Sequence, residues 1–303
     1  MKFVDLFSGA GGLSLGFKKE GFKSQGFVEF WQPAIETMLN NDPEEKLILK
    51  DITEVTKKHF TSNTDVVVGG PPCQGFSMAG KREVGDNRNS LFEYYFKVVD
   101  YTQPKFCLME NVRGILSMKD VDGKLIINKI ISAFKDKGYR TDIKLLNSFN
   151  YCVPQKRQRI IIIANKEGIK FDFPEPRSKM FLKEVLTLPY EELPEIQHIY
   201  TKKKMLMKKG FYMKPGQKIS SFGSAGIKLR WSHAPTITKT GRYIHPGFNR
   251  LISVREAARI QTFPDDYMFS GNIDQKYGQI GNAVPVNMAR ALAGQIKKNI
   301  GDD

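Results

Sequence analysis

The 303-residue sequence has few cysteines, few histidines and no long apolar run. Three cysteines are too few for a disulfide framework, and an odd count suits a reducing compartment. Four scattered histidines, none beside a cysteine pair, argue against a structural zinc site. The apolar start of the chain is interrupted by Asp5, so it resembles neither a signal peptide nor a membrane span. We therefore expect a cytoplasmic protein without a metal.

Acidic residues are also scarce relative to basic ones. Lysine and arginine number 47 against 32 aspartates and glutamates, which gives a formal net charge of +15. A hydrophobic content of 41% and a mean hydropathy of -0.37 exclude a largely disordered chain and a multi-span membrane protein. Because so large a charge destabilises a fold through self-repulsion unless an anionic partner uses it, nucleic acid is the leading candidate partner.

The charge excess is concentrated in one part of the chain. Residues 165–250 contain 17 basic and 7 acidic side chains, a net charge of +10, whereas the rest of the chain carries only +5. This distribution suggests that one segment binds a polyanion while the remainder has another task. An ordinary lysine-rich surface is the alternative interpretation.

The first half of the sequence alternates short apolar runs with amphipathic stretches. Continuous Val, Ile and Leu runs are typical of strands buried on both faces, and strands that alternate with helices predict a mainly parallel sheet. We therefore predict an α/β fold, with a doubly wound domain over residues 1–166. The predicted strands are residues 3–7, 24–28, 46–50, 65–68, 106–109, 142–146 and 159–164.

After Asn165, prolines, glycines and lysine clusters break the pattern, which predicts a smaller, loop-rich domain. Apart from residues 234–239, no strand or helix of average length is evident there. Regular structure returns at Ser253, which forms a capping box with Glu256 at the start of a helix. A last helix is predicted over residues 286–300 from its apolar stripe.

A glycine-rich segment, residues 5–13, lies between the first predicted strand and the first helix. Glycines at this turn allow the backbone to approach a ligand closely. Glu29 follows 17 residues after Gly12, where a carboxylate can accept hydrogen bonds from ribose hydroxyls. The spacing departs from the dinucleotide fingerprint and lacks the lysine of a phosphate loop. The cofactor therefore remains open between a dinucleotide and S-adenosylmethionine.

Cys73 follows Pro71 and Pro72 directly after the predicted strand at 65–68. A cysteine at the carboxyl end of a parallel strand lies where α/β folds bind ligands, and its thiolate is a candidate nucleophile. Cys107 lies inside an apolar run and fits the commoner role of a small core residue, as does Cys152.

Glu110 ends the next apolar run, where partial burial could keep its carboxyl available as a proton donor. A helix cap or an ion pair with Arg113 is the structural alternative. Arg157 and Arg159 alternate at strand spacing before an isoleucine run. Side chains two apart on a strand share a face, as binding of an anion or a carbonyl would require.

Together these motifs resemble the DNA (cytosine-5) methyltransferases, and the resemblance extends over nearly all of the chain. The ordered set is far more specific than any single member. Its segments are the Phe7 to Gly12 loop, Pro71-Pro72-Cys73-Gln74, Glu110-Asn111-Val112, Gln155 to Arg159, Arg255-Glu256-Ala257-Ala258-Arg259 and Gly281-Asn282-Ala283-Val284-Pro285.

The resemblance implies an S-adenosylmethionine-dependent methyltransferase fold and roles for individual residues. Cys73 would attack carbon 6 of a flipped-out cytosine, Glu110 would protonate ring N3, and Arg157 and Arg159 would hold the base carbonyl and nearby phosphate. The implied cofactor residues are Phe7, Gly9, Gly11, Gly12, Leu13, Glu29, Phe30, Asp51, Ile52, Pro72, Leu91, Asn282 and Val284. The implied DNA-binding residues are Ser77, Arg82, Gln155, Thr236, Lys239 and Arg242.

The resemblance also implies a division into domains. Residues 1–168 and 280–303 would form the catalytic and cofactor-binding domain, and residues 169–279 the target-recognition domain, where the charge excess lies. Residues 75–90 suit a mobile loop that closes on DNA. We expect a monomer that acts on double-stranded DNA in a bacterial cytoplasm, with a companion restriction endonuclease as a possible partner.

Three other interpretations compete with this one. A tRNA cytosine-5 methyltransferase would carry a Cys-Phe-Thr segment after Glu-Asn-Val, which this sequence lacks. A nucleotide-binding dehydrogenase leaves Cys73 and the two arginines without a purpose. A non-catalytic DNA-binding relative would be expected to have lost the cysteine or the glutamate, and both are present. The motifs of zinc deaminases do not occur.

Overall fold

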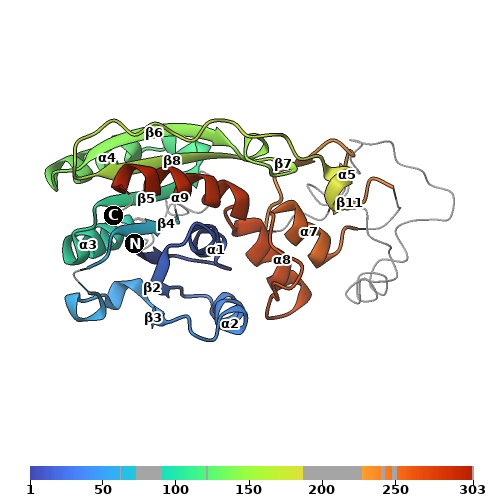
Figure 1. Cartoon of the computed structure of the whole chain (residues 1–303), viewed down its shortest axis with the longest axis horizontal. Coiled ribbons are helices and arrows are strands. Elements are labelled where there is room, and N and C mark those ends of the chain that lie inside the picture. The colour runs from blue at the N-terminus through green and yellow to red at the C-terminus, as the bar shows by residue number, and fades with distance from the viewer. Residues whose placement is uncertain are drawn as a thin grey trace. The chain divides into compact units, whose positions relative to one another are not determined.

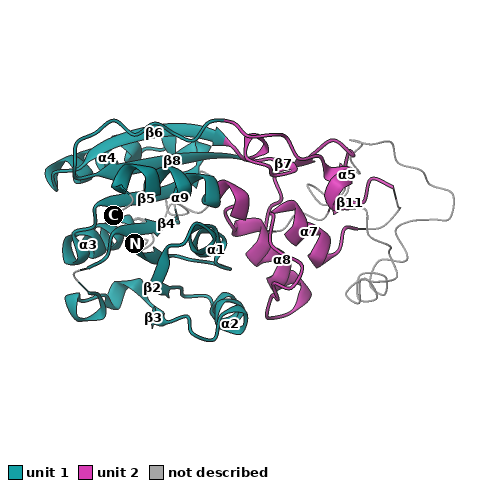
Figure 2. Ribbon diagram, in the orientation of Figure 1, with its two compact units in different colours: residues 1–146, 158–175, 289–303 teal, residues 147–157, 176–288 magenta. Residues whose placement is uncertain are grey.

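The computed structural model describes residues 1–61, 63–72, 91–120, 122–186, 227–239, 243–247 and 251–301. The chain divides into two compact units (Figure 2). The first unit comprises residues 1–146, 158–175 and 289–303, and the second comprises residues 147–157 and 176–288. These units divide the chain differently from the expected domains: residues 147–157 and 280–288 fall in the second unit, and residues 169–175 fall in the first.

The first unit is built on a seven-stranded sheet in the order β3-β2-β1-β4-β5-β8-β6 (Figure 1). The pairs from β3 to β5 are parallel, and β8 is antiparallel to β5. Each of the seven predicted apolar runs forms one of these strands, which confirms the α/β class and the mainly parallel sheet. The strands are β1 (Lys2–Leu6), β2 (Lys23–Val28), β3 (Leu47–Leu49), β4 (Val66–Gly69), β5 (Phe106–Val112), β6 (Arg140–Asn147) and β8 (Gln158–Asn165).

Strand β1 shows why the apolar runs are continuous. Side chains alternate between the two faces of a strand, so both faces of a buried strand must be apolar. On one face, the Phe3 ring lies 5.4 Å from the Phe17 ring. Val4 and Leu6 belong to a buried cluster that also contains Phe96. Burial on both sides fits the place of β1 inside the sheet, between β2 and β4.

The helices of the first unit fill the intervals between the strands. They are α1 (Gly12–Lys19), α2 (Gln32–Asn41), α3 (Leu91–Thr102) and α4 (Ile126–Asp136), with 3-10 turns η1 (Ile52–Glu54), η2 (Lys57–His59) and η5 (Arg113–Leu116). The predicted last helix is α9 (Val286–Ile300). From Ala289 onward α9 belongs to the first unit, and Arg290 Nε binds Glu20 Oε1 at 2.6 Å. The end of the chain therefore folds back beside α1.

The elements among the described residues of the second unit are short. Strand pairs β7–β10 and β9–β11 are parallel and two residues long. The predicted capping box is confirmed, because Ser253 Oγ accepts from Glu256 N and Glu256 Oε2 accepts from Ser253 N. The elements are η6 (Ser148–Asn150), β7 (Gln155–Lys156), α5 (Leu182–Val185), β9 (Ile227–Lys228), β10 (Ala234–Pro235), β11 (Tyr243–Ile244), α7 (Val254–Ile260) and α8 (Ile273–Asn282).

Two features are absent from the described parts of the chain. None of the helices placed there is long and apolar enough to span a membrane. Within the same residues, no three His, Cys, Asp or Glu side chains gather as metal ligands.

Candidate active site

The strand order changes direction between β1 and β4. From β1 the chain moves outward to β2 and β3, and from β4 it moves to β5 on the other side. Open α/β sheets bind ligands at the carboxyl ends of the strands beside such a switch point. The glycine-rich segment follows β1, and Gly70-Pro71-Pro72 follows β4. The two motifs that the sequence singles out therefore flank the same switch point.

The glycine-rich segment after β1 is a loop with several left-handed residues. Phe7, Gly9 and Gly11 have φ angles of 58°, 55° and 76°. Ser8 N donates to Val28 O at 3.2 Å, and Gly11 N donates to Ser8 O at 3.0 Å. A Cβ at Gly9 would meet no atom within 4 Å, so the backbone conformation, rather than crowding, favours glycine there. Gly11 then caps α1.

A partly buried glutamate holds this loop, and a buried aspartate binds the first turn of α1 behind it. Glu29 Oε2 accepts from Gly9 N at 2.8 Å, and Glu29 Oε1 accepts from Trp31 N at 2.7 Å. Burial raises the pKa of Glu29, and these amide hydrogen bonds oppose that effect. Asp5 Oδ2 accepts from Ser14 Oγ at 2.6 Å and from Ser14 N at 3.2 Å. Burial raises the pKa of Asp5 to about 7.

The other expected cofactor residues of the first unit include one exposed ring. Phe30 is 77% exposed directly after Glu29, whereas Ile52 is buried. Asp51 Oδ1 caps η1 by accepting from Thr53 N at 2.8 Å. The remaining members are Gly12 and Leu13 at the start of α1, Leu91 at the start of α3 and Pro72 after β4.

Glu110 lies at the carboxyl end of β5 and pairs with Arg159 of the neighbouring strand. Arg159 Nε lies 2.8 Å from Glu110 Oε1, and both side chains are largely buried. The expected alternative partner of Glu110 was Arg113, and the structure gives Arg159 instead. A Cβ at Gly70 would lie 3.2 Å from Glu110 Oε2. The absence of a side chain at Gly70 therefore leaves room for this carboxylate beside the segment that leads to Cys73.

Asn111 connects the same end of β5 to that segment. Its side chain is buried, and Nδ2 donates to Pro71 O at 3.0 Å. Its Oδ1 accepts from Val112 N at 2.8 Å. Both functions of the amide are therefore used, one of them to fix the main chain two residues before Cys73.

The basic motif at residues 155–159 is divided between the two units. Arg159 belongs to the first unit, and Gln155 and Arg157 belong to the second. Gln155 Oε1 accepts from Ile237 N at 2.7 Å, and its Nε2 donates to Gln261 Oε1 at 2.8 Å. Arg157 is 1% exposed and donates to main-chain carbonyls. The sequence predicted that Arg157 and Arg159 share one face of a strand. In the structure Arg157 lies in the chain between β7 and β8, outside both strands, and the two arginines bind different partners.

The threonine segment of the second unit packs against the same motif. Thr236 Oγ1 donates to Lys156 O at 3.2 Å, and Tyr243 Oη donates to Thr236 O at 2.6 Å. Asn282 ends α8, and Val284 is buried two residues later. Lys239 is the last described residue of its segment.

The comparisons with known proteins give the identity of the family. The profile of C-5 cytosine-specific DNA methylases matches residues 1–298. The chain belongs to this family. The methylase is 34% identical to Type II methyltransferase M1.HphI of Haemophilus parahaemolyticus, over 98% of this chain and 87% of that protein. It is also 34% identical to Type II methyltransferase M.FnuDI of Fusobacterium nucleatum, over 100% and 96% of the two chains.

Solved structures agree with the fold of the methylase. A prophage-encoded Escherichia coli protein has a TM-score of 0.79 at 27% identity and covers 98% of each chain. The S. pombe Dnmt2 methyltransferase has a TM-score of 0.74 at 15% identity, covering 100% of this chain and 99% of its own, which bears on the fold alone. The methylase is thus a DNA cytosine-5 methyltransferase by family, with the α/β fold that the family resemblance implied.

Several predicted site residues of the methylase lie outside the described residues. They are Cys73, Ser77, Arg82 and Arg242, together with the predicted loop at residues 75–90 and the whole stretch of residues 187–226. Their roles stay predictions.

The sequence did not predict a role for two residues, Asp5 and Gln261, whose side chains hold neighbouring segments in place. Asp5 was interpreted as an interruption of an apolar run and as the start of the glycine-rich segment, with no role of its own, although a carboxylate inside a buried strand is itself a signal. Gln261 has no such signal, because its partners are distant in sequence. Its Nε2 donates to Ile280 O at 2.7 Å and to Ala283 O at 3.2 Å.

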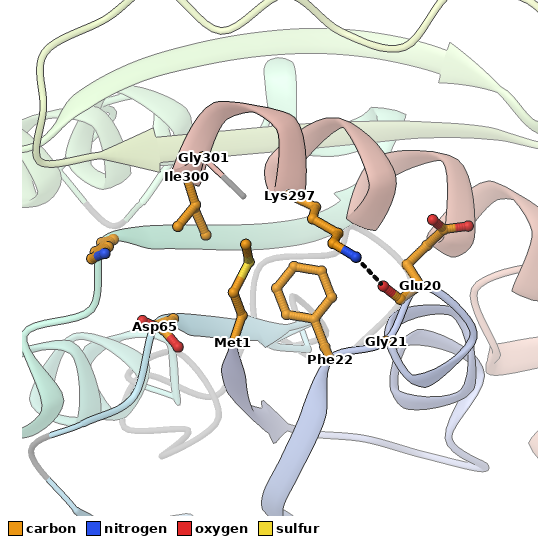
Figure 3. A pocket seen from close by; sticks show the side chains of 9 residues that line it. Met1, Glu20, Gly21, Phe22, Asp65, Lys297, Ile300 and Gly301 are labelled. Atoms are coloured by element: carbon orange, nitrogen blue, oxygen red, sulfur yellow. Dashed lines mark hydrogen bonds between the residues drawn. The ribbon is translucent and has the colours of Figure 1, made fainter. Parts of the chain in front are cut away.

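The first unit of the methylase also has a cavity of about 400 Å³ at the opposite edge of the sheet (Figure 3). Met1, Asp65 and Lys105 line it, and each immediately precedes a strand of the parallel set. The end of α9 closes it with Lys297, whose Nζ donates to Glu20 O at 3.4 Å. This cavity is therefore at the amino-terminal edge, away from the glycine loop and Glu110.

Proposed function

We propose that this methylase transfers a methyl group from S-adenosylmethionine to carbon 5 of a cytosine that is flipped out of duplex DNA. The reaction would pass through a covalent bond between Cys73 Sγ and carbon 6 of the base. The observation that best supports this proposal is the placement of Glu110 at the end of β5, beside Gly70 and paired with Arg159. A proton donor is thereby held next to the segment that carries the nucleophile.

Activation of the cytosine needs both Cys73 and Glu110. Carbon 5 of cytosine is a poor nucleophile, so the Cys73 thiolate first adds to carbon 6 while Glu110 protonates ring N3. This addition makes carbon 5 part of an enamine. Arg159, which already orients Glu110, is suited to hold the base carbonyl or the adjacent phosphate. When carbon 5 later loses its proton to a base, elimination breaks the sulfur–carbon bond and frees the Cys73 thiolate, and ring N3 returns its proton to Glu110.

The glycine loop has the features that a nucleoside cofactor requires. S-adenosylmethionine, when bound, supplies the electrophilic methyl group that carbon 5 receives. Glu29 is partly buried and has a fixed orientation, because its two oxygens accept from Gly9 N and Trp31 N. Phe30 offers an exposed ring for stacking on adenine. The proposed cofactor residues of the first unit are Phe7, Gly9, Gly11, Gly12, Leu13, Glu29, Phe30, Asp51, Ile52, Pro72 and Leu91.

DNA recognition is assigned to the second unit and its basic segment. Residues 165–250 carry two thirds of the net charge, which suits a polyanion. A base inside a duplex exposes neither face of carbon 6, so the nucleotide must leave the stack. Thr236, Lys239, Gln155 and Arg242 are the proposed residues around it. The Type II relatives support a place in restriction and modification, in which a companion endonuclease would cut the same sequence when it is unmethylated.

The covalent step can be tested with 5-fluorocytosine in the target position of a duplex. Fluorine replaces the proton that must leave, so the wild-type methylase should form a stable protein–DNA adduct in the presence of S-adenosylmethionine. The adduct is measured by denaturing gel and intact mass. Cys73→Ala should form none, although it should bind S-adenosylhomocysteine with unchanged affinity. An adduct with Cys73→Ala, or none with a wild-type protein that methylates normal DNA, contradicts the mechanism.

A further inference from the structure

Arg157 is enclosed by main-chain carbonyls rather than open to a ligand. Its Nη1 donates to Ile237 O at 2.9 Å and to Gly281 O at 2.9 Å, and its Nη2 donates to Asn282 O at 3.3 Å. The side chain is 1% exposed. All these groups belong to the second unit. The charge of Arg157 is thus directed into the protein, in contrast with the role of an anion ligand that the sequence predicted for it.

The three acceptors come from two segments that are distant in sequence and have different expected tasks. Ile237 follows Thr236, which is expected to lie near the flipped base. Gly281 and Asn282 belong to the segment expected to complete the cofactor site. A Cβ at Gly281 would lie 2.3 Å from the carbonyl carbon of Thr238, so the two main chains touch. The guanidinium of Arg157 therefore joins the two segments close to the point where their main chains touch.

A neighbouring pair of glutamines repeats this arrangement. Gln155 accepts from Ile237 N, and Gln261 donates to Ile280 O and Ala283 O. Gln155 and Gln261 bind each other and are both fully buried. Buried polar groups of this kind are costly unless every partner stays in place, so the network fixes a single arrangement of the segments.

We infer that Arg157 is a positioning residue that sets the DNA-binding Thr236–Ile237 segment and the cofactor-binding Gly281–Asn282 segment together. This inference rests on the proposed function of the two segments. Arginine suits the task because its planar group carries five donors in fixed directions, whereas lysine offers one compact charge. Loss of the guanidinium should weaken binding of both substrates at once, without removing a contact to DNA phosphate.

The test compares Arg157→Gln with Arg255→Gln in the full-length methylase. Arg255 is a matched control because its Nη1 also donates to two main-chain carbonyls in the same unit, Pro264 O at 3.1 Å and Tyr267 O at 3.0 Å. Neither acceptor lies in the two joined segments. Steady-state methylation of plasmid DNA gives kcat and the two KM values, and thermal melting gives the loss of stability of each variant.

Arg157→Gln should raise the KM for S-adenosylmethionine and the KM for DNA by about tenfold or more each, because several hydrogen bonds from a charged donor are lost. The value of kcat should change much less. Arg255→Gln should also lower the melting temperature but leave both KM values unchanged. Gly281→Ala, which forces apart the same main chains, should reproduce the effect of Arg157→Gln on both KM values.

Salt dependence separates a positioning role from a phosphate contact. The affinity of the protein for a labelled duplex of random sequence is measured over a series of salt concentrations. With Arg157→Gln the slope of log K against log salt should equal that of wild type. A slope whose magnitude is smaller by about one, which is the signature of a lost phosphate contact, would overturn the inference. A rise in only one KM would also overturn it. Absence of methyl transfer by the wild-type protein would instead refute the proposed function.

Discussion

Asp5 is a buried carboxylate at the end of β1 with an unusual titration. Its Oδ2 accepts twice from Ser14, whereas its buried Oδ1 has no hydrogen-bond partner among the described residues. Burial is the main cause that raises its pKa to about 7, and Glu45 and Glu29 act in the same direction. A carboxyl whose folded pKa lies above its unfolded value binds a proton more tightly in the folded state. Asp5 therefore stabilises the fold in acid and loses that contribution as the pH rises from about 4 to about 7.

Replacement of Asp5 by asparagine should remove this part of the pH dependence. The asparagine carbonyl can still accept from Ser14, but the side chain cannot ionise. Relative to wild type, the free energy of unfolding of Asp5→Asn should therefore rise between pH 4 and pH 8 by about 2 to 4 kcal/mol. Urea denaturation of both proteins between pH 4 and pH 8 measures the difference between their free energies of unfolding. A difference that is independent of pH would show that Asp5 is ionised in the folded protein throughout.

Glu110 allows a second prediction at the scale of one residue. Glu110→Gln keeps the size of the side chain and one carbonyl oxygen for Arg159, but it cannot supply a proton. We expect kcat to fall by about 10² to 10⁴, the usual contribution of a general acid, because protonation of ring N3 is lost. Affinity for S-adenosylhomocysteine, measured by calorimetry, should not change. A variant with kcat near that of wild type would exclude Glu110 as the acid.

The sequence singled out individual residues as candidates where a local motif marks them. Glu110 and the glycine loop were recognised because neighbouring residues define them. The environment of Arg157 was not predictable, since its acceptors come from Ile237, Gly281 and Asn282, and main-chain carbonyls leave no trace in a sequence. The same holds for Gln261, whose role depends entirely on residues that folding brings to it.

At the scale of the element, the strands were the most predictable part of the fold. Continuous apolar runs mark strands buried on both faces, and all seven runs form strands. Their order in the sheet was less accessible, because neither the antiparallel β8 nor its place between β5 and β6 follows from composition. Prediction from apolar runs was less accurate at residues 234–239, where only Ala234–Pro235 forms a strand.

The contact between α1 and α9 gives a prediction about packing. A Cβ at Gly16 would lie 2.4 Å from Ala289 Cβ and 2.7 Å from Arg290 N, so the two helices touch through their backbones. Gly16→Ala should lower the free energy of unfolding by about 1 to 3 kcal/mol, as overpacking does.

Gly294 of α9 provides the matched control for this prediction. A Cβ there would meet Glu20 Oε2 at 3.4 Å, an ordinary contact with a flexible side chain. Gly294→Ala should therefore be neutral or stabilise the protein by up to about 1 kcal/mol through helix propensity. Urea denaturation of both variants compares the two glycines. Equal effects of the two substitutions would contradict the close approach of α1 and α9.

At the scale of the whole molecule, the charge excess and the proposed catalytic residues lie in different parts of the chain. The glycine loop and Glu110 lie in the first unit, whose net charge is small for its length. The basic residues gather in segment 165–250, most of which belongs to the second unit. The sequence alone predicted this separation from the count of charges. It could not predict that the basic motif at 155–159 would itself be divided, because that depends on which residues each arginine contacts.

Methylation of cytosine at a defined sequence is the central claim, and bisulfite sequencing tests it most directly. Plasmid DNA is isolated from cells that express the wild-type protein or Cys73→Ala at equal levels. With the wild-type protein, cytosines in one recurring sequence should resist conversion, and with Cys73→Ala all cytosines should convert. Full conversion with a folded wild-type protein that binds S-adenosylhomocysteine, or equal protection by Cys73→Ala, would contradict the account.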